Sequence, residues 1–135
     1  MVNQQFAFAV HTLAALAANP KQGMTSESIA SSVNTNPVVI RRLLAKLSKS
    51  ALVETQMGKN GGVRLKKNPQ DITLKDIYLA IQSRPLLAAN ENETNRKCMI
   101  SCKMKEIMKN VISEAEQATL NHLETIKLSD LAKQF

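Results

Sequence analysis

The spacing of apolar residues along the chain predicts a mainly helical protein. Leucine, isoleucine, valine and alanine recur every three or four residues in five segments, which places them on one face of a helix in each. These predicted helices cover residues 6–19, 25–33, 37–50, 72–81 and 104–126, and a short helix follows over residues 128–135. Thr25 or Ser26, Asn36 before Pro37, and Thr73 stand where a side chain can cap a helix start.

Two short stretches after the third predicted helix favour a β-hairpin. Residues 52–55 and 63–65 have the composition of strands, and the glycines in the turn at 58–62 allow the positive backbone angles of a tight reversal. The turn does not match a nucleotide-binding loop, because its lysine is misplaced and no serine or threonine follows to hold magnesium. The predicted fold class is therefore mainly α with a small β-hairpin.

The predicted helices at 25–33 and 37–50 are separated by a brief polar turn, as in a helix-turn-helix. In the second of them the apolar residues share one face and the opposite face is cationic. The buried stripe would consist of Ile40, Leu43, Leu44 and Leu47. With the hairpin as a wing, the sequence predicts a winged helix-turn-helix domain over residues 1–83.

The positive charge of the chain is concentrated next to this motif. Residues 41–67 carry eight lysines and arginines and a single acid, Glu54, so this segment accounts for the whole net charge of +7. A local excess of this kind attracts polyanions, and double-stranded DNA is the expected partner. The alternative is a solvated basic face that has no ligand.

The exposed face of the third predicted helix supplies the candidate base contacts. Its two arginines can form paired hydrogen bonds with guanine, and its valines can touch thymine methyl groups. Contact with phosphate alone is the alternative for both arginines. The hydroxyl residues at the start of the preceding helix are either phosphate clamps or caps, and the lysines are expected to contribute salt-dependent affinity. The predicted DNA-binding residues are Thr25, Ser26, Ser28, Asn36, Val38, Val39, Arg41, Arg42, Lys46, Lys49, Lys59, Arg64 and Lys66.

The long apolar stripe at residues 104–126 extends beyond what a small domain can cover. A helix of this length is about 34 Å long. We expect a homodimer joined through it, since twofold pairing is the commonest assembly; in the alternative it folds back onto the first helix of its own chain. The predicted organisation is a DNA-binding domain at 1–83, a linker and possible sensor loop at 84–103, and a dimerisation helix with a C-terminal cap at 104–135.

Cys98 and Cys102 lie among four cations and form the candidate sensor. Positive neighbours favour the thiolate, which is the form that is oxidised or binds metal. If the segment is helical, both sulfur atoms share one face, which suits a soft metal better than an intrahelical disulfide. Inert thiols, redox sensing and metal binding all remain open, as does small-molecule sensing without the cysteines. His11 and His122 are expected to be packed or solvated rather than to bind a ligand.

Other classes of protein are disfavoured. The apolar run at residues 6–18 is interrupted and falls short of the about 20 residues that a membrane span needs, so no membrane contact is expected. It also lacks the flanks of a secretory signal, which favours a cytoplasmic location. No nucleophile–base pair, metal-binding spacing or carboxylate cluster stands out, so the chain is not expected to be an enzyme.

Four segments together resemble the bacterial winged-helix regulators of the Rrf2 family, which includes the IscR, NsrR and CymR types. They are residues 36–44; Leu47 with residues 51–53; Gly58 with residues 61–65; and residues 72–77. The lead into the third predicted helix, at residues 34–39, is similar to that of YwnA-type members and less so to that of the iron–sulfur members.

The resemblance implies a dimeric DNA-binding repressor or activator, and we expect a repressor acting on a palindromic operator. In such a protein the long late helix joins the protomers and the wing touches the minor groove. Ala51 stands where the family often has a glycine before the wing. The alternative function, which CymR-type members allow, is a protein-interaction module that regulates a partner enzyme on the same scaffold.

The resemblance also implies a sensor between Pro85 and Met104. Family members that hold a two-iron two-sulfur cluster carry three cysteines there, whereas this chain has only Cys98 and Cys102. A cluster would need ligands from elsewhere, so no cofactor is expected.

Overall fold

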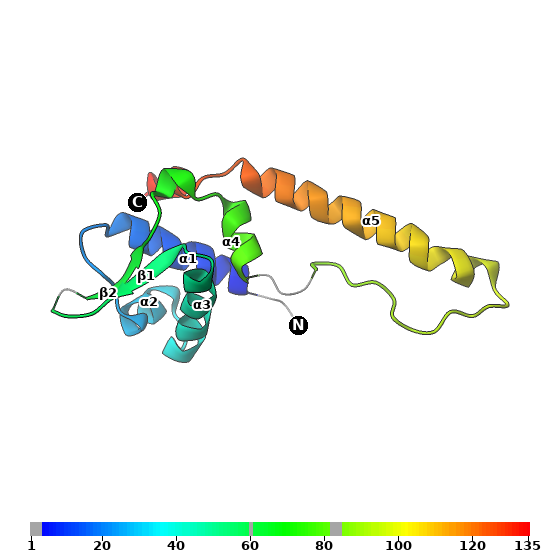
Figure 1. Ribbon diagram of the computed structural model, residues 1–135, viewed down its shortest axis with the longest axis horizontal. Helices are drawn as coiled ribbons and strands as arrows, with labels where there is room; N and C mark the ends of the chain where they lie inside the picture. Colours follow the sequence, from blue (N-terminus) through cyan, green and yellow to red (C-terminus); the bar gives the residue numbers. More distant parts are fainter. Residues whose placement is uncertain (1–3, 60, 82–84) are drawn as a thin grey trace.

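The computed structural model describes residues 4–59, 61–81 and 85–135. The mainly helical fold with a small hairpin is confirmed (Figure 1). In chain order the elements are α1 (Gln5–Ala18), α2 (Ser26–Val33), α3 (Pro37–Lys49), β1 (Val53–Gln56), β2 (Gly62–Leu65), the 3-10 helix η1 (Pro69–Asp71), α4 (Leu74–Ile81), α5 (Met99–Glu124) and α6 (Leu128–Ala132). Asn60 in the predicted hairpin turn, and the predicted domain boundary between residues 83 and 84, lie outside the described residues.

The core of the amino-terminal domain is built around α1, which packs against α2, α3, α4, α6 and β2. Leu13 of α1, Ile29 of α2, Ile40 of α3 and Ile77 of α4 are fully buried in one cluster. Each such side chain contributes about 1.5–3 kcal/mol when it is withdrawn from water. Leu128 of α6 is buried in the same cluster, so the end of the chain folds back onto the domain.

Hydrogen bonds at helix ends shape the helix-turn-helix. The hydroxyl of Thr25 accepts from the backbone N–H of Ser28 at 3.0 Å, and the side-chain oxygen of Asn36 accepts from the N–H of Val38 at 2.9 Å. Between the two caps, Asn34 takes a left-handed backbone conformation with φ of 66°. Asparagine tolerates that conformation better than most residues, so α2 ends there and the chain turns directly into α3.

The end of α3 is closed by a Schellman motif. The N–H of Ala51 bonds to the carbonyl of Ser48 at 2.9 Å, and the N–H of Leu52 bonds to the carbonyl of Leu47 at 3.0 Å. This pattern places Ala51 in the left-handed region, with φ of 60°. Glycine usually occupies this position of the motif. The glycine that the family often has here is therefore compatible with the same turn.

The wing is a two-stranded antiparallel hairpin that is also tied to the segment before α2. Val53 pairs with Leu65 and Gln56 with Gly62. Met24 exchanges two backbone hydrogen bonds with the second strand, at 2.8 and 3.1 Å. Gly62 has φ of 134°, and a Cβ atom there would lie 2.8 Å from the carbonyl oxygen of Met24. Only glycine permits this close approach.

The long helix α5 leaves the domain and projects away from it (Figure 1). Its 26 residues correspond to about 39 Å. Its C-terminal part lies beside α4, and none of its residues is buried. The described residues between α4 and α5 form neither helix nor strand and are mostly exposed.

The start of α5 differs from the sequence expectation. The helix begins at Met99 rather than at Met104. Residues 99–103 contain no proline or glycine, and the N–H of Cys102 bonds to the carbonyl of Cys98 at 3.0 Å, which extends the helical pattern backwards. Cys98 is therefore the N-cap residue and Cys102 lies in the first turn.

Candidate nucleic-acid interface

The amphipathic pattern of α3 is present as predicted. Ile40, Leu43, Leu44 and Leu47 are buried against the rest of the domain. The opposite face is accessible to solvent, because Val38, Arg41, Arg42, Ala45 and Lys49 are exposed. Val39 and Lys46 are half-buried at the margin of that face. The side chains that the sequence assigns to base contacts therefore lie mainly on the outside of the second helix of the helix-turn-helix.

The two arginines of α3 lie on different flanks of the helix. Arg41 turns toward α2, where its Nη1 lies 3.2 Å from Oε1 of Glu27. Arg42 lines a small pocket of about 140 Å³ together with Gln5 of α1. Among the described residues, Arg42 has no hydrogen-bond or ion-pair partner. Both guanidinium groups can reach a ligand, but only that of Arg41 is held by a carboxylate.

Lys46 and Lys49 also differ, although both lie on α3. The Nζ atom of Lys46 donates to Oε1 of Gln5 at 3.0 Å, so its ammonium is held at the start of α1. Lys49 is exposed in the last turn of the helix. The structure thus separates two lysines that the sequence treats as equivalent.

The wing places its cations unequally. Lys59 and Lys66 are exposed. Arg64 is half-buried and stands opposite Glu54 in the strand register. A carboxylate therefore stands across the ladder from Arg64, whereas the two lysines extend into solvent.

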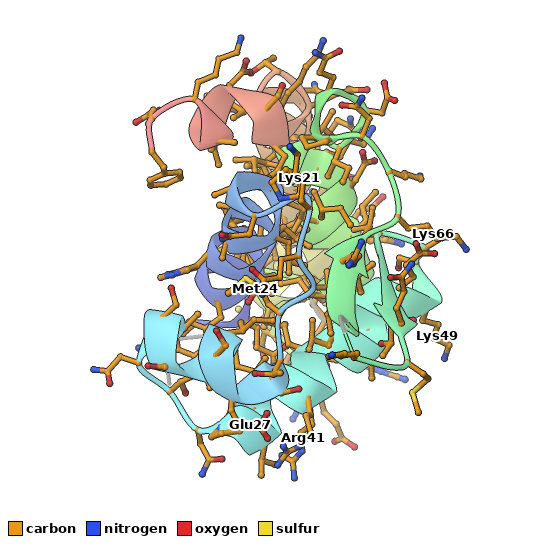
Figure 2. All side chains as sticks on the ribbon, turned by 90° about the vertical axis from the view of Figure 1, so that its left-hand side faces the viewer. Lys21, Met24, Glu27, Arg41, Lys49 and Lys66 are labelled. Carbon is orange, nitrogen blue, oxygen red and sulfur yellow. The ribbon has the colours of Figure 1, made fainter. Side chains whose placement is uncertain are left out.

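Figure 2 shows the distribution of these charges around the domain. Glu27 and Arg41 lie next to each other at the lower edge of the view, while Lys49 and Lys66 point outward along the right-hand edge. Exposed cations therefore extend from α3 to the wing.

The residues at the start of α2 have a defined structural role. The hydroxyl of Thr25 is the N-cap acceptor, so this residue has the capping role that was one of its two interpretations. Ser26 is half-buried and Ser28 is exposed in the first turn. Glu27 lies between them, and the sequence analysis did not assign it to the interface. The sequence does single out Glu27, because it is the only acidic residue from position 25 to position 50.

The candidate sensor residues lie at the far end of α5. Cys98 is half-buried and Cys102 is exposed. The Sγ atom of Cys102 lies 3.8 and 3.7 Å from the carbonyl oxygens of Asn95 and Arg96. In the part of the chain that the structure describes, no three His, Cys, Asp or Glu side chains gather as metal ligands. An iron–sulfur cluster takes four ligands, so the donor set of a single chain does not fit one.

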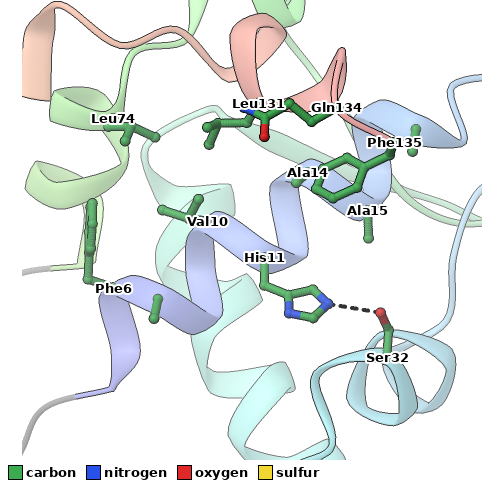
Figure 3. Close-up of a pocket in the computed structure, with 12 residues that line it drawn as sticks. Phe6, Val10, His11, Ala14, Ala15, Ser32, Leu74, Leu131, Gln134 and Phe135 are labelled. Atoms are coloured by element: carbon green, nitrogen blue, oxygen red, sulfur yellow. Dashed lines mark hydrogen bonds between the residues drawn. The ribbon is translucent and has the colours of Figure 1, made fainter.

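An apolar cavity of about 590 Å³ lies between α1, α4 and α6 (Figure 3). Phe6, Val10, Leu131 and Phe135 contribute to its walls. His11 is at its edge, with Nε2 hydrogen-bonded to the hydroxyl of Ser32 at 2.9 Å. This histidine is solvent-exposed and links α1 to α2.

Comparison with known proteins agrees with the geometry. The Rrf2 family model, described as an iron-dependent transcriptional regulator, matches residues 2–134. YwnA of Bacillus subtilis (strain 168), named as an HTH-type transcriptional regulator, is 35% identical over 131 residues, which are 97% of this chain and 96% of YwnA. The HTH-type transcriptional regulator NsrR of Halalkalibacterium halodurans is 29% identical over 127 residues, covering 92% of this chain and 84% of NsrR.

Solved structures show the same fold. A crystal structure of a protein classed as a transcriptional regulator, from Lactobacillus plantarum, superimposes with a TM-score of 0.80 at 27% sequence identity. The match covers 95% of this chain and 87% of that one. Among the described residues, no helix is long and apolar enough to span a membrane. The relatives are regulators of transcription, which confirms the expectation that the protein is not an enzyme. The chain belongs to the Rrf2 family of DNA-binding transcriptional regulators.

Proposed function

We propose that the protein is a cytoplasmic homodimeric repressor that binds a palindromic operator through α3 and the wing of each protomer. The observation that carries this proposal is the exposed face of α3, which presents arginine and valine side chains beyond a buried apolar stripe. In helix-turn-helix proteins the second helix enters the major groove with its N-terminal residues nearest the bases. Val38, Arg41 and Arg42 all lie in the first half of α3.

The contacts divide into two kinds. Arg42 and Arg41 suit base reading, because a guanidinium can donate two hydrogen bonds to guanine in the major groove. Lys49, Lys59 and Lys66 suit phosphate contacts, which raise affinity for any sequence and weaken with salt.

Exposed apolar residues on α5 support the homodimer. Six large apolar side chains along the outer half of the helix are between 39% and 72% exposed. A contiguous apolar strip of this kind is unusual on a monomer and is typical of an interaction surface. The strip consists of Met99, Ile100, Met104, Ile107, Met108 and Val111. Pairing of two α5 helices removes these side chains from water.

We further propose that Cys98 and Cys102 modulate DNA binding. They lie at the start of the same helix, so oxidation there acts directly on the element that joins the protomers. Treatment with peroxide, followed by thiol titration and DNA titration, tests the link. Operator affinity that changes in the wild type and not in a Cys98→Ser, Cys102→Ser variant supports it. Unchanged affinity after complete thiol oxidation contradicts it, and directs attention to small-molecule binding in the α1–α4–α6 cavity.

The function is tested by selecting binding sites from a pool of random duplex DNA. The selected duplex and a scrambled duplex are then titrated at several salt concentrations. We expect a ratio of affinities of about 1,000 or more in favour of the selected duplex. Comparable affinities would show that the protein is not a sequence-specific regulator, and would favour a protein-interaction module.

Two variants separate the two kinds of contact. Arg42→Ala is expected to weaken binding to the selected duplex about tenfold, with little effect on the scrambled one. Lys66→Ala is expected to weaken both duplexes to a similar extent. An equal loss on both duplexes for Arg42→Ala would show that this arginine contacts phosphate only.

A further inference from the structure

Glu27 stands in an unexpected place for an acidic residue. It lies in the first turn of α2, and its carboxylate is paired with Arg41 on the exposed side of α3. The rest of the helix-turn-helix, from position 25 to position 50, carries only positive charges. Glu27 therefore reduces the positive potential at the point where the proposed function requires a polyanion to approach.

The contribution of this ion pair to folding stability is too small to account for its presence. The side chains of Arg41 and Glu27 are 54% and 68% exposed. Exposed pairs of this kind contribute little to folding, because water and salt screen them. Helix-dipole stabilisation of an acid in the first turn of α2 is similarly small. We therefore consider the effect of the pair on DNA binding, since it lies on the candidate interface.

The carboxylate is unfavourable for phosphate contact. The N-terminal end of a helix attracts anions through its unpaired N–H groups, and helices in this position of a helix-turn-helix commonly meet the DNA backbone. Glu27 occupies that end of α2 with a negative charge, which repels phosphates. It also draws the guanidinium of Arg41 toward α2, whereas Arg42 on the other flank is not held by any described residue.

We infer that Glu27 is a specificity-determining residue of the interface. It holds the guanidinium of Arg41 by one nitrogen, so that the remaining donors face a guanine, and it disfavours the contact of Arg41 with phosphate. An arginine has five N–H donors in a rigid fork, so one bond to Glu27 leaves enough donors for a base. This inference rests on the DNA-binding function proposed above.

The test uses full-length variants and the selected and scrambled duplexes. For Glu27→Gln we expect affinity for the scrambled duplex to rise about threefold, since a repulsive charge is removed. At the same time we expect the ratio of selected to scrambled affinity to fall about tenfold, since a neutral amide holds the guanidinium of Arg41 more weakly than the carboxylate does. Glu27→Asp keeps the charge but shortens the side chain, and is expected to lower the ratio without raising affinity for the scrambled duplex.

Two controls make the result specific. Glu91→Gln removes the same charge from an exposed position between α4 and α5, outside every helix and strand, and should leave the ratio unchanged. In an Arg41→Ala background, Glu27→Gln should have no further effect on the ratio, because the residue that it orients is absent.

The outcomes separate this inference from the proposed function. If the wild type fails to discriminate between the duplexes, the proposed function fails first. If the wild type discriminates and Glu27→Gln raises both affinities equally, Glu27 acts only as a charge and the inference is overturned. It is also overturned if the effects of Glu27→Gln and Arg41→Ala on the ratio simply add.

Discussion

Tyr78 connects the long helix to the DNA-binding domain through a single hydroxyl group. Its O–H donates to Oε1 of Glu116 on α5 at 3.0 Å, and its ring packs edge-on against Phe6 with the ring centres 5.9 Å apart. Burial, followed by the hydrogen bond and the negative charge of Glu116, raises the pKa of Tyr78 to about 12. The neutral phenol is therefore the form that the folded state prefers.

Replacing Tyr78 by phenylalanine is expected to lower the free energy of unfolding by about 1 kcal/mol, which is typical for a lost hydrogen bond. Because the pKa is raised on folding from 10.0 to about 12, its contribution to stability is complete below pH 10 and is lost as the pH rises through that interval. Tyr78 is the only tyrosine of the chain, so phenolate absorbance follows it alone. Ionisation near pH 10 in the folded protein would contradict the account.

Ala51 offers a direct test of the turn after α3. Its left-handed conformation is unfavourable for a residue with a Cβ atom. We expect Ala51→Gly to raise the free energy of unfolding by about 0.5–1 kcal/mol, after the greater chain entropy of glycine is subtracted. Urea unfolding provides the measurement. Ala45→Gly, in the middle of α3, is the matched control and should lower stability by about 1 kcal/mol; a loss at both positions would contradict the strain argument.

Residues that act on near neighbours could be predicted from the sequence, and residues paired over long distances could not. The caps at Thr25, Asn36 and Thr73 bind N–H groups two or three positions away, so the local pattern contains the information. Glu27 and Arg41 are 14 positions apart, and their pairing depends on the angle at which α2 crosses α3. Only the tertiary structure supplies that angle.

At the scale of elements, the lysines of α3 differ in how available they are to a ligand. Lys46 is held by Gln5, whereas Lys49 extends into solvent. The wing adds Lys66 on the same side as Lys49 (Figure 2). The number of phosphate contacts is therefore expected to be smaller than the number of lysines on α3 and the wing.

The salt dependence of DNA binding measures this difference. Each phosphate contact contributes about 0.9 to the slope of the logarithm of affinity against the logarithm of salt concentration. Lys49→Gln is expected to reduce the slope by about that amount, and Lys46→Gln to reduce it much less. Equal reductions for the two variants would show that Lys46 leaves Gln5 when DNA is bound.

Element boundaries followed the local sequence where breakers or caps are present. Asn36 before Pro37 marks the start of α3 to the residue. The start of α5 has neither proline nor a side-chain cap, since Cys98 makes no capping hydrogen bond. With neither a breaker nor a side-chain cap, nothing in the local sequence marks Met99 as the first residue of the helix.

At the scale of the whole molecule, α5 carries six of the twelve large apolar side chains that are exposed among the described residues. Val111 and Ile107 are 48% and 51% exposed in the middle of the helix. Ile107→Asp combined with Val111→Asp is expected to convert the dimer to a monomer, because charges would have to be buried at the interface. Sedimentation velocity measures the change. The domain should keep its thermal stability, since neither residue belongs to its core; a variant that stays dimeric would exclude α5 as the interface.

The sequence could predict the basic α3, the hairpin after it and the long helix α5, because charge and periodicity are local properties. It could not predict how two copies are arranged, since that depends on surfaces far apart in the chain. The spacing of the two α3 helices in the proposed dimer would determine the spacing of half-sites on DNA. A measurement of half-site spacing therefore tests the proposed dimer and the proposed function together.

A hydroxyl-radical footprint on the selected duplex, combined with the stoichiometry of the complex, measures the half-site spacing most directly. We expect two chains per duplex and two protected blocks on one face of the DNA, with centres about 10 base pairs apart or a multiple of that distance. If Arg42→Ala needs about ten times more protein to give the same pattern, the pattern is assigned to α3. A single chain per duplex, or uniform protection without paired blocks, would contradict the account.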